Sequence, residues 1–173
     1  GKLPFAAAGY GASAHLAGEL LKRRAGVDMP FVNYKGDVQA ITDVAGGQVN
    51  IGIVTLVSAT QLIKAGRVRA IAIMGSGRVS SLPDVPTVSE AGLSGFSGDA
   101  WGGLSVRSGT PPAIIRRINE ALVAALDDVA VRDSMPQLGV SPVGSSPESF
   151  AEFLRVENDK WTRTISEAKL KLE

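Results

Sequence analysis

Residues 7–16 read Ala-Ala-Gly-Tyr-Gly-Ala-Ser-Ala-His-Leu, and this stretch decides the fold. The small apolar residues that precede Gly9 are typical of a buried strand, and Gly9 and Gly11 mark a turn after it. The residues that follow place leucines on one helix face, namely Leu16, Leu20 and Leu21. Three basic residues and a glycine then suit the carboxyl end of a helix. The sequence therefore predicts a strand over 5–8, a glycine turn and a helix over 13–25.

The alternation of strand and helix continues beyond the first unit. Apolar runs and helical patterns follow one another as strand 30–34, helix 37–45, strand 49–54, helix 56–65 and strand 68–74. Glycines lie where helices of these lengths end. Strands that alternate with helices form a mostly parallel sheet through right-handed crossovers. The expected fold class is therefore α/β, with a parallel or mixed sheet flanked by helices.

The remainder of the chain has a different texture. Glycine, serine and proline dominate residues 75–109, where Thr87-x-x-Glu90 has the spacing of a capping box and predicts a short helix. Residues 100–106 resemble a strand. Two long helices are then expected, from Thr110 to about residue 127 and from Ser146 to about residue 165. The C-terminal third is thus mostly helical, with too few strands for a sheet of its own.

Composition excludes several classes of function. The 173 residues carry 18 Lys and Arg against 17 Asp and Glu, with no basic run that could follow a phosphate backbone, so nucleic acid is not an expected partner. The absence of cysteine removes disulfides, thiolate nucleophiles and zinc–thiolate sites. No run of apolar residues approaches the length of a membrane span. Because the chain opens almost directly on strand residues, we expect it to be a fragment.

Three interpretations fit the spacing Gly-x-Gly-x-x-Ala over residues 9–14. A dinucleotide turn would need an acid at the end of the second strand, where Lys35 stands instead. A purely structural turn would use the glycines for backbone geometry alone. A small-anion site would use the helix start, because Ser13 at or near the N-cap aims free N–H groups at one point. The anion site carries most weight, with the N–H groups of Gly11, Ala12 and Ser13 as donors to a carboxylate.

The other strand ends belong to the same expected site. In open α/β sheets the ligand lies beyond the carboxyl ends of the strands, which here lead into Tyr34-Lys35-Gly36 and into Thr55 and Ser58. With the glycine turn they supply backbone donors, hydroxyls, one ammonium and one phenol but no carboxylate, and such a rim selects anions. A solvated charge for Lys35 and a core or rim aromatic for Tyr34 stay open as alternatives.

Enzyme signatures are scarce. His15 and Glu19 lie four residues apart on one helix face, but two ligands do not make a metal site, and such pairs are usually surface contacts or caps. No nucleophile elbow, Walker lysine or acid pair placed for sugar chemistry is found. Trp101 beside two glycines would form the floor of a cleft or a core residue at a domain junction. We therefore expect no enzyme activity, no cofactor and no metal site.

Several motifs together resemble one family. They are Gly9-Tyr-Gly-Ala-Ser-Ala-His15, Tyr34-Lys35-Gly36, Gly46-Gly47-Gln48-Val49, Leu82-Pro83-Asp84-Val85-Pro86-Thr87, Gly109-Thr110-Pro111-Pro112 and Lys160-Trp161. In this order and spacing the chain resembles the tripartite tricarboxylate transporter substrate-binding proteins, also called the Bug family. The resemblance covers essentially the whole chain.

The resemblance implies a periplasmic solute-binding protein with two α/β lobes, of the type II periplasmic-binding-protein fold. Such a protein closes on a small carboxylate, commonly a di- or tricarboxylate, and serves membrane permease subunits. Residues 1–97 would form the second lobe, and 98–173 the returning part of the first, whose opening part is absent. The implied ligand-binding residues are Gly9, Tyr10, Gly11, Ala12, Ser13, Tyr34, Lys35, Gly36, Thr55 and Ser58, with His15 and Trp101 as further candidates.

One departure from the family pattern bears on the ligand. Many members have a polar pair such as Asp-Asn after the third strand of this lobe, where this chain has Val54-Thr55. The missing acid favours plain carboxylates over amino acids. The alternatives to a transport receptor are a nucleotide- or phosphate-binding α/β enzyme domain and the ligand-sensing module of a regulator.

An incomplete first lobe has physical consequences of its own. Helices 114–126 and 150–165 need a sheet to cover, so we expect them to expose apolar surface and the chain to associate with another copy or with the absent segment. One lobe also supplies few hydrogen bonds. We therefore expect residues 1–173 alone to bind dicarboxylates weakly.

Overall fold

The computed structural model describes residues 3–170, and its sheet has three parallel strands. β1 (Phe5–Ala8) lies in the centre, between β2 (Phe31–Tyr34) and β3 (Ile51–Gly52). The register pairs Ala8 with Tyr34 and Ala6 with Gly52. Because the strands are parallel, all three end at the same edge of the sheet. The glycine turn follows the central strand at that edge.

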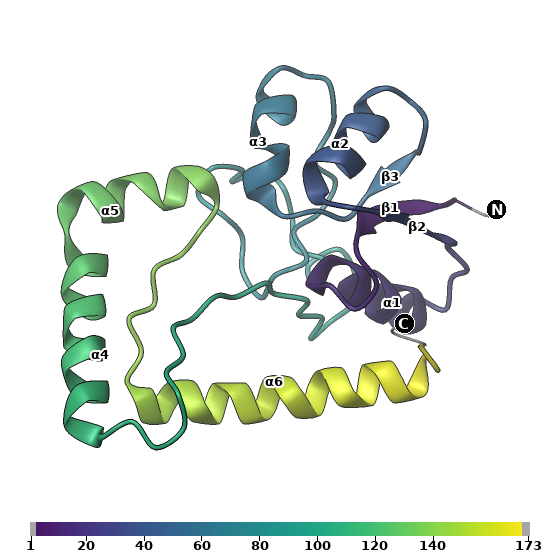
Figure 1. Cartoon of the computed structure of the whole chain (residues 1–173). Helices are drawn as coiled ribbons and strands as arrows, with labels where there is room; N and C mark the ends of the chain where they lie inside the picture. Colours follow the sequence, from purple (N-terminus) through teal and green to yellow (C-terminus); the bar gives the residue numbers. More distant parts are fainter. Residues whose placement is uncertain (1–2, 171–173) are drawn as a thin grey trace.

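Three helices flank this sheet. α1 (Ser13–Ala25) links β1 to β2, α2 (Asp37–Ala45) links β2 to β3, and α3 (Leu56–Lys64) follows β3. Figure 1 shows α2 and α3 together on one side of the strands and α1 on the other. Each helix begins just after the carboxyl end of a strand. The N-termini of α1, α2 and α3 are therefore gathered at one edge, and the expected α/β class is confirmed.

The core is divided between the two faces of β1. Alternate side chains of a strand point to opposite faces. Phe5 and Ala7 pack with Ile53 on one face, while Ala6 packs with Ala40 and Val49 on the other. All three strand residues are fully buried, and the two alanines leave room for helices to approach closely.

The helix predictions are more accurate than the strand predictions. The helices at 13–25 and 37–45 have the expected bounds, and α3 ends one residue early. The expected strand 49–54 shrinks to β3. The strand predictions for 68–74 and 100–106 are wrong: the first retains a single parallel bridge, between Ile73 and Thr87, and the second pairs with no strand among residues 3–170. A strand needs a neighbour to bond to, and neither run has one along its length.

The predicted capping box forms without its helix. The Thr87 N–H donates to Glu90 Oε2 at 2.8 Å, and the Glu90 N–H donates to Thr87 Oγ1 at 3.1 Å. The residues that follow form turns and no helix. Arg78 Nε also donates to the Glu90 carboxylate at 2.9 Å, and these bonds lower the pKa of Glu90. The prediction of a short helix here is wrong, and the box closes a turn instead.

The C-terminal third is helical, as expected. α4 (Pro112–Asp127) leads into α5 (Val129–Ser134) and a 3₁₀ turn, η1 (Pro136–Leu138), and α6 (Pro147–Glu167) then returns toward the sheet (Figure 1). Trp161 of α6 packs against a cluster of Leu20, Val88 and Phe96. An ion pair between Arg23 and Glu167 joins α1 to α6 as well. The last half of α6 is thus held against the first hundred residues.

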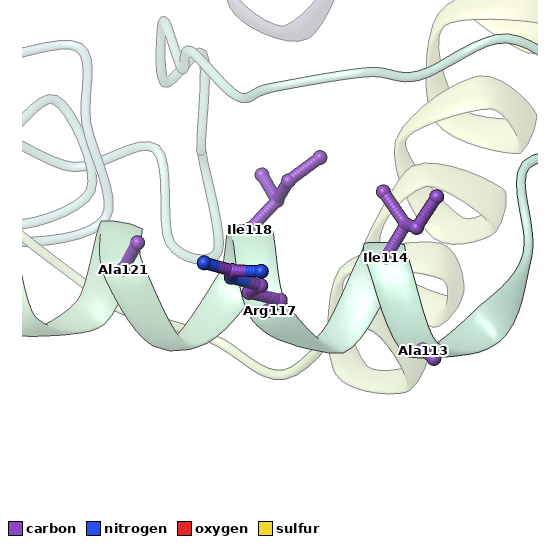
Figure 2. A pocket seen from close by; sticks show the side chains of 5 residues that line it. All are labelled: Ala113, Ile114, Arg117, Ile118 and Ala121. Atoms are coloured by element: carbon purple, nitrogen blue, oxygen red, sulfur yellow. The ribbon is translucent and has the colours of Figure 1, made fainter.

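Apolar surface is exposed on α4, as expected. None of its residues is buried, and Ile114 and Ile118 are 49% and 37% exposed. Figure 2 shows both isoleucines projecting from α4. Together with Ala113, Arg117 and Ala121 they line a shallow groove. Among the helices of residues 3–170, none is long and apolar enough to cross a membrane. Self-association of the chain stays a prediction.

Candidate functional site

Backbone hydrogen bonds hold the glycine turn in place. Gly9 and Gly11 have φ angles of 54° and 76°, a region that L side chains rarely adopt. The Gly9 N–H donates to the Tyr34 carbonyl at 3.0 Å, and the Ala12 N–H donates to the Gly9 carbonyl at 3.3 Å. Both glycines are therefore required by conformation, as each interpretation of the spacing assumed.

The side chain of His15 holds the turn through a hydrogen bond. Its Nδ1 accepts the Gly11 N–H at 3.0 Å, and its ring stacks on Phe31 with centroids 4.1 Å apart. The side chain is 3% exposed. Accepting a hydrogen bond at Nδ1 requires a histidine that is unprotonated there. Burial lowers the pKa of His15, against a smaller opposing effect of the Glu19 carboxylate.

The lowered pKa of His15 predicts a pH dependence of stability. The unfolded chain binds a proton at His15 more readily than the folded chain does, so this residue should reduce the free energy of unfolding as pH falls below about 6.5. Urea unfolding at pH 7.5 and 5.5 should therefore show a larger acid loss for the wild type than for His15→Asn, which does not titrate. Equal losses in the two proteins would contradict this role.

The start of α1 presents unpaired backbone donors. The helix N-cap is Ala12, with no side-chain cap, and the first N–H bonded to the helix is that of Leu16. Within residues 3–170 no hydrogen bond engages the N–H groups of Ser13, Ala14 and His15. Of the three N–H groups expected as donors, that of Gly11 is bonded to His15 and that of Ala12 to Gly9, and only that of Ser13 is unpaired among the described residues.

The residues at the end of β2 are divided between internal bonds and solvent. The Tyr34 hydroxyl donates to Asp43 Oδ2 at 2.8 Å, and this bond raises the pKa of Tyr34. Lys35 is exposed, and Gly36 is the extended N-cap of α2. The phenol thus faces the last turns of α2, and Lys35 takes part in no ion pair within residues 3–170.

The end of β3 corrects the sequence analysis, which expected no carboxylate on this rim. Asp37 Oδ2 accepts from the Thr55 N–H at 2.8 Å and from Thr55 Oγ1 at 2.7 Å. Ser58 Oγ lies 3.4 Å from the same oxygen. An acid is therefore present beside Thr55, supplied by α2 rather than by the residues after β3. The Thr55 N–H and hydroxyl are bonded to it, and the Ser58 hydroxyl donates to the Thr55 carbonyl at 2.8 Å.

Among the remaining candidates, Tyr10 lies in the turn, and Glu19 and Trp101 have their contacts elsewhere. Tyr10 is 55% exposed and contacts His15 edge to face. Glu19 accepts a hydrogen bond from Lys22 Nζ at 2.8 Å and has no side-chain hydrogen bond to His15. Trp101 packs edge-on against the rings at the start of α6, Phe150 and Phe153. Within residues 3–170 no group of three potential metal-binding side chains is found.

Sequence reasoning missed the two acids of α2. Asp37 and Asp43 contact Thr55 and Tyr34, both of which had been assigned to the site. The available signal was the position of Asp37 at the start of a helix that follows a strand end, where an acid interacts favourably with the helix dipole. The contact between Asp37 and Thr55 spans 18 residues and has no signature in the sequence.

Comparison with known proteins assigns the family. The family model described as "Tripartite tricarboxylate transporter family receptor" matches residues 1–170. This chain belongs to that family. It is 39% identical over 171 residues to the UPF0065 protein in the tcbD-tcbE intergenic region of Pseudomonas sp. (strain P51), covering 98% of the chain and 51% of that protein. It is 32% identical to Protein BugT of Bordetella pertussis, covering 100% of the chain and 53% of that protein.

Solved structures share the fold. R. palustris Rpa4515 with adipate has a TM-score of 0.85 at 28% identity, with 97% of this chain and 57% of that one covered. MatC (Rpa3494) from Rhodopseudomonas palustris with bound malate has a TM-score of 0.78 at 33% identity, with coverages of 94% and 56%. The chain thus spans about half the length of the curated relatives it matches, and somewhat more of the solved ones. The resemblance to a periplasmic-binding-protein fold is confirmed.

Proposed function

We propose that this chain forms one side of the ligand site of a periplasmic receptor that captures a small carboxylate for a tripartite transporter. The observation that carries this proposal is the set of unpaired N–H groups of Ser13, Ala14 and His15 at the start of α1. They lie at the end of the central strand, where open α/β sheets bind ligands. A helix start is favourable for an anion because its N–H groups and its dipole act together.

Two similar solved structures support a carboxylate as the ligand. Rpa4515 was solved with adipate and MatC with malate, both of which are dicarboxylates. The family description names a transporter receptor, which supports membrane permease subunits as partners and the periplasm as the location. We propose the same partners and location for this protein.

The proposed site is shared between two lobes. Residues 1–97 hold the sheet and the α1 start, and we assign them to one lobe. Residues 98–173 hold the segment 100–106, which pairs with no strand among residues 3–170, and helix α4, and we assign them to the other lobe. Charge-assisted hydrogen bonds contribute about 1.5–3 kcal/mol each, so three give about 5–9 kcal/mol before association costs of at least ~4 kcal/mol. Micromolar binding needs about 8 kcal/mol net. Closure of both lobes on the ligand supplies the difference.

The proposal predicts a selective effect of Ser13→Pro. Proline lacks the N–H but suits the first position of a helix, and Ala12 already has the extended ψ of 157° that a following proline requires. In the protein expressed from its whole reading frame, we expect Ser13→Pro to weaken binding of the tightest carboxylate by about 10–100-fold. The measurement is calorimetry with succinate, malate, adipate, citrate, glutamate and benzoate.

Ser13→Ala is the matched control, since it removes the hydroxyl and keeps the N–H. It should weaken binding less than Ser13→Pro, and both variants should unfold within ~1 kcal/mol of the wild type. Residues 1–173 alone should bind the same ligands far more weakly than the protein from the whole reading frame. Unchanged affinity in Ser13→Pro would contradict the site, and submicromolar binding by residues 1–173 would contradict the two-lobe mechanism.

A further inference from the structure

Asp37 introduces a negative charge at the edge of the sheet where the ligand site is proposed. Its Oδ2 accepts the N–H and hydroxyl of Thr55. Asp37 follows β2 and Thr55 follows β3, the two strands on either side of β1. The hydrogen bonds between them therefore connect the two outer strand ends, next to the end of the central strand from which the glycine turn departs.

This carboxylate lacks a compensating cation. None of the ion pairs within residues 3–170 includes Asp37, although Lys35 lies only two residues away. All of its hydrogen bonds there fall on Oδ2, so Oδ1 has no donor. Asp37 is half-buried and Thr55 is exposed, so a ligand at this edge can reach them. Two groups that would serve an anion, the Thr55 and Ser58 donors, are already taken.

We propose that Asp37 determines ligand specificity, so that the ligand presents one carboxylate to the start of α1 and a hydrogen-bond donor, an ammonium group, to Asp37. This inference rests on the proposed function and specifies its substrate class. A second carboxylate placed here would meet Asp37 as a like charge and find the donors of Thr55 and Ser58 occupied. Like-charge contacts in a binding site carry an unfavourable free energy that an ammonium group converts into attraction.

The test compares ligands that differ only in the distal group. The pairs are glutarate with 4-aminobutyrate and succinate with 3-aminopropanoate, measured by calorimetry on the protein from the whole reading frame. The wild type should bind the amino acid of the tighter pair better than the diacid. Asp37→Asn keeps an acceptor for Thr55 but removes the charge, so it should shift the ratio of the two affinities toward the diacid by about tenfold.

Two further variants separate specificity from structure. Asp28→Asn removes the same charge from the loop before β2, at the opposite edge of the sheet, and should leave the ratio unchanged. Asp37→Ala frees the Thr55 N–H and hydroxyl and should strengthen diacid binding further. A ratio that stays the same in Asp37→Asn, or a wild type that prefers the diacid, overturns the inference.

Different results would overturn the role of Asp37 and the carboxylate receptor. Binding that Ser13→Pro weakens, with no change of ligand preference in Asp37→Asn, overturns the role of Asp37 and leaves the carboxylate receptor intact. Absence of binding by every carboxylate in both sets of ligands overturns the receptor and the specificity residue together.

Discussion

Replacing Phe5 by alanine is expected to lower the free energy of unfolding by about 3–5 kcal/mol. Phe5 is fully buried at the start of the central strand, and its ring lies 5.4 Å from that of Phe31. Truncation removes the apolar contacts of a whole ring, and the surrounding strands and α1 cannot collapse to fill the space. Urea unfolding followed by circular dichroism measures the loss.

Val143→Ala is the control for this substitution. Val143 is 83% exposed, so its truncation should change the free energy of unfolding by less than about 0.5 kcal/mol. A loss below about 1 kcal/mol for Phe5→Ala would show that β1 is not the centre of the folded core.

Replacing Gly18 by valine should be the second most damaging change. A Cβ at Gly18 would lie 2.6 Å from Phe5 Cζ and 3.0 Å from Ile53 Cδ1, closer than van der Waals contact allows. α1 would have to move away from the sheet, and overpacking of this kind costs about 1–3 kcal/mol, occasionally more. Thermal unfolding should therefore show a clear decrease in the midpoint for Gly18→Val.

The same contact predicts how the two substitutions combine. Phe5→Ala removes the ring that the new side chain at Gly18 would strike. The double variant should therefore be more stable than the sum of the two single losses predicts, by at least ~1 kcal/mol. Additive losses would mean that the two positions do not share one packing contact.

The sequence predicts helices and the turn well because their signals are local. The bounds of α1 follow from leucine spacing and Gly26, the end of α2 follows from Gly46, and three residues predict the glycine turn. Strands were harder to predict, because residues 68–74 and 100–106 have strand composition, but the first forms a single bridge and the second pairs with no strand among residues 3–170. Composition reports the preference of a segment, whereas pairing depends on a neighbour elsewhere in the chain.

The candidate site was predictable to a similar extent. The position of the turn and of the strand ends followed from the α/β pattern, and the structure brings these segments to one edge. The partners of their side chains did not follow from it. Asp37 and Asp43 bond to Thr55 and Tyr34, and His15 occupies the Gly11 N–H. Such pairings depend on rotamers and on distances of a few ångströms, which periodicity does not encode.

The bonds within the glycine turn bear on the kinetics of ligand capture. The Gly9, Gly11 and Ala12 N–H groups are all bonded within the chain, to Tyr34, His15 and Gly9 respectively. These bonds fix the turn, so it should lose little conformational freedom when a ligand binds at the proposed donors of Ser13, Ala14 and His15, which follow it. The association rate should accordingly be set by diffusion and domain motion rather than by ordering of the loop. Side chains next to the turn can then change during evolution, and alter selectivity, while the backbone proposed to bind the anion stays the same.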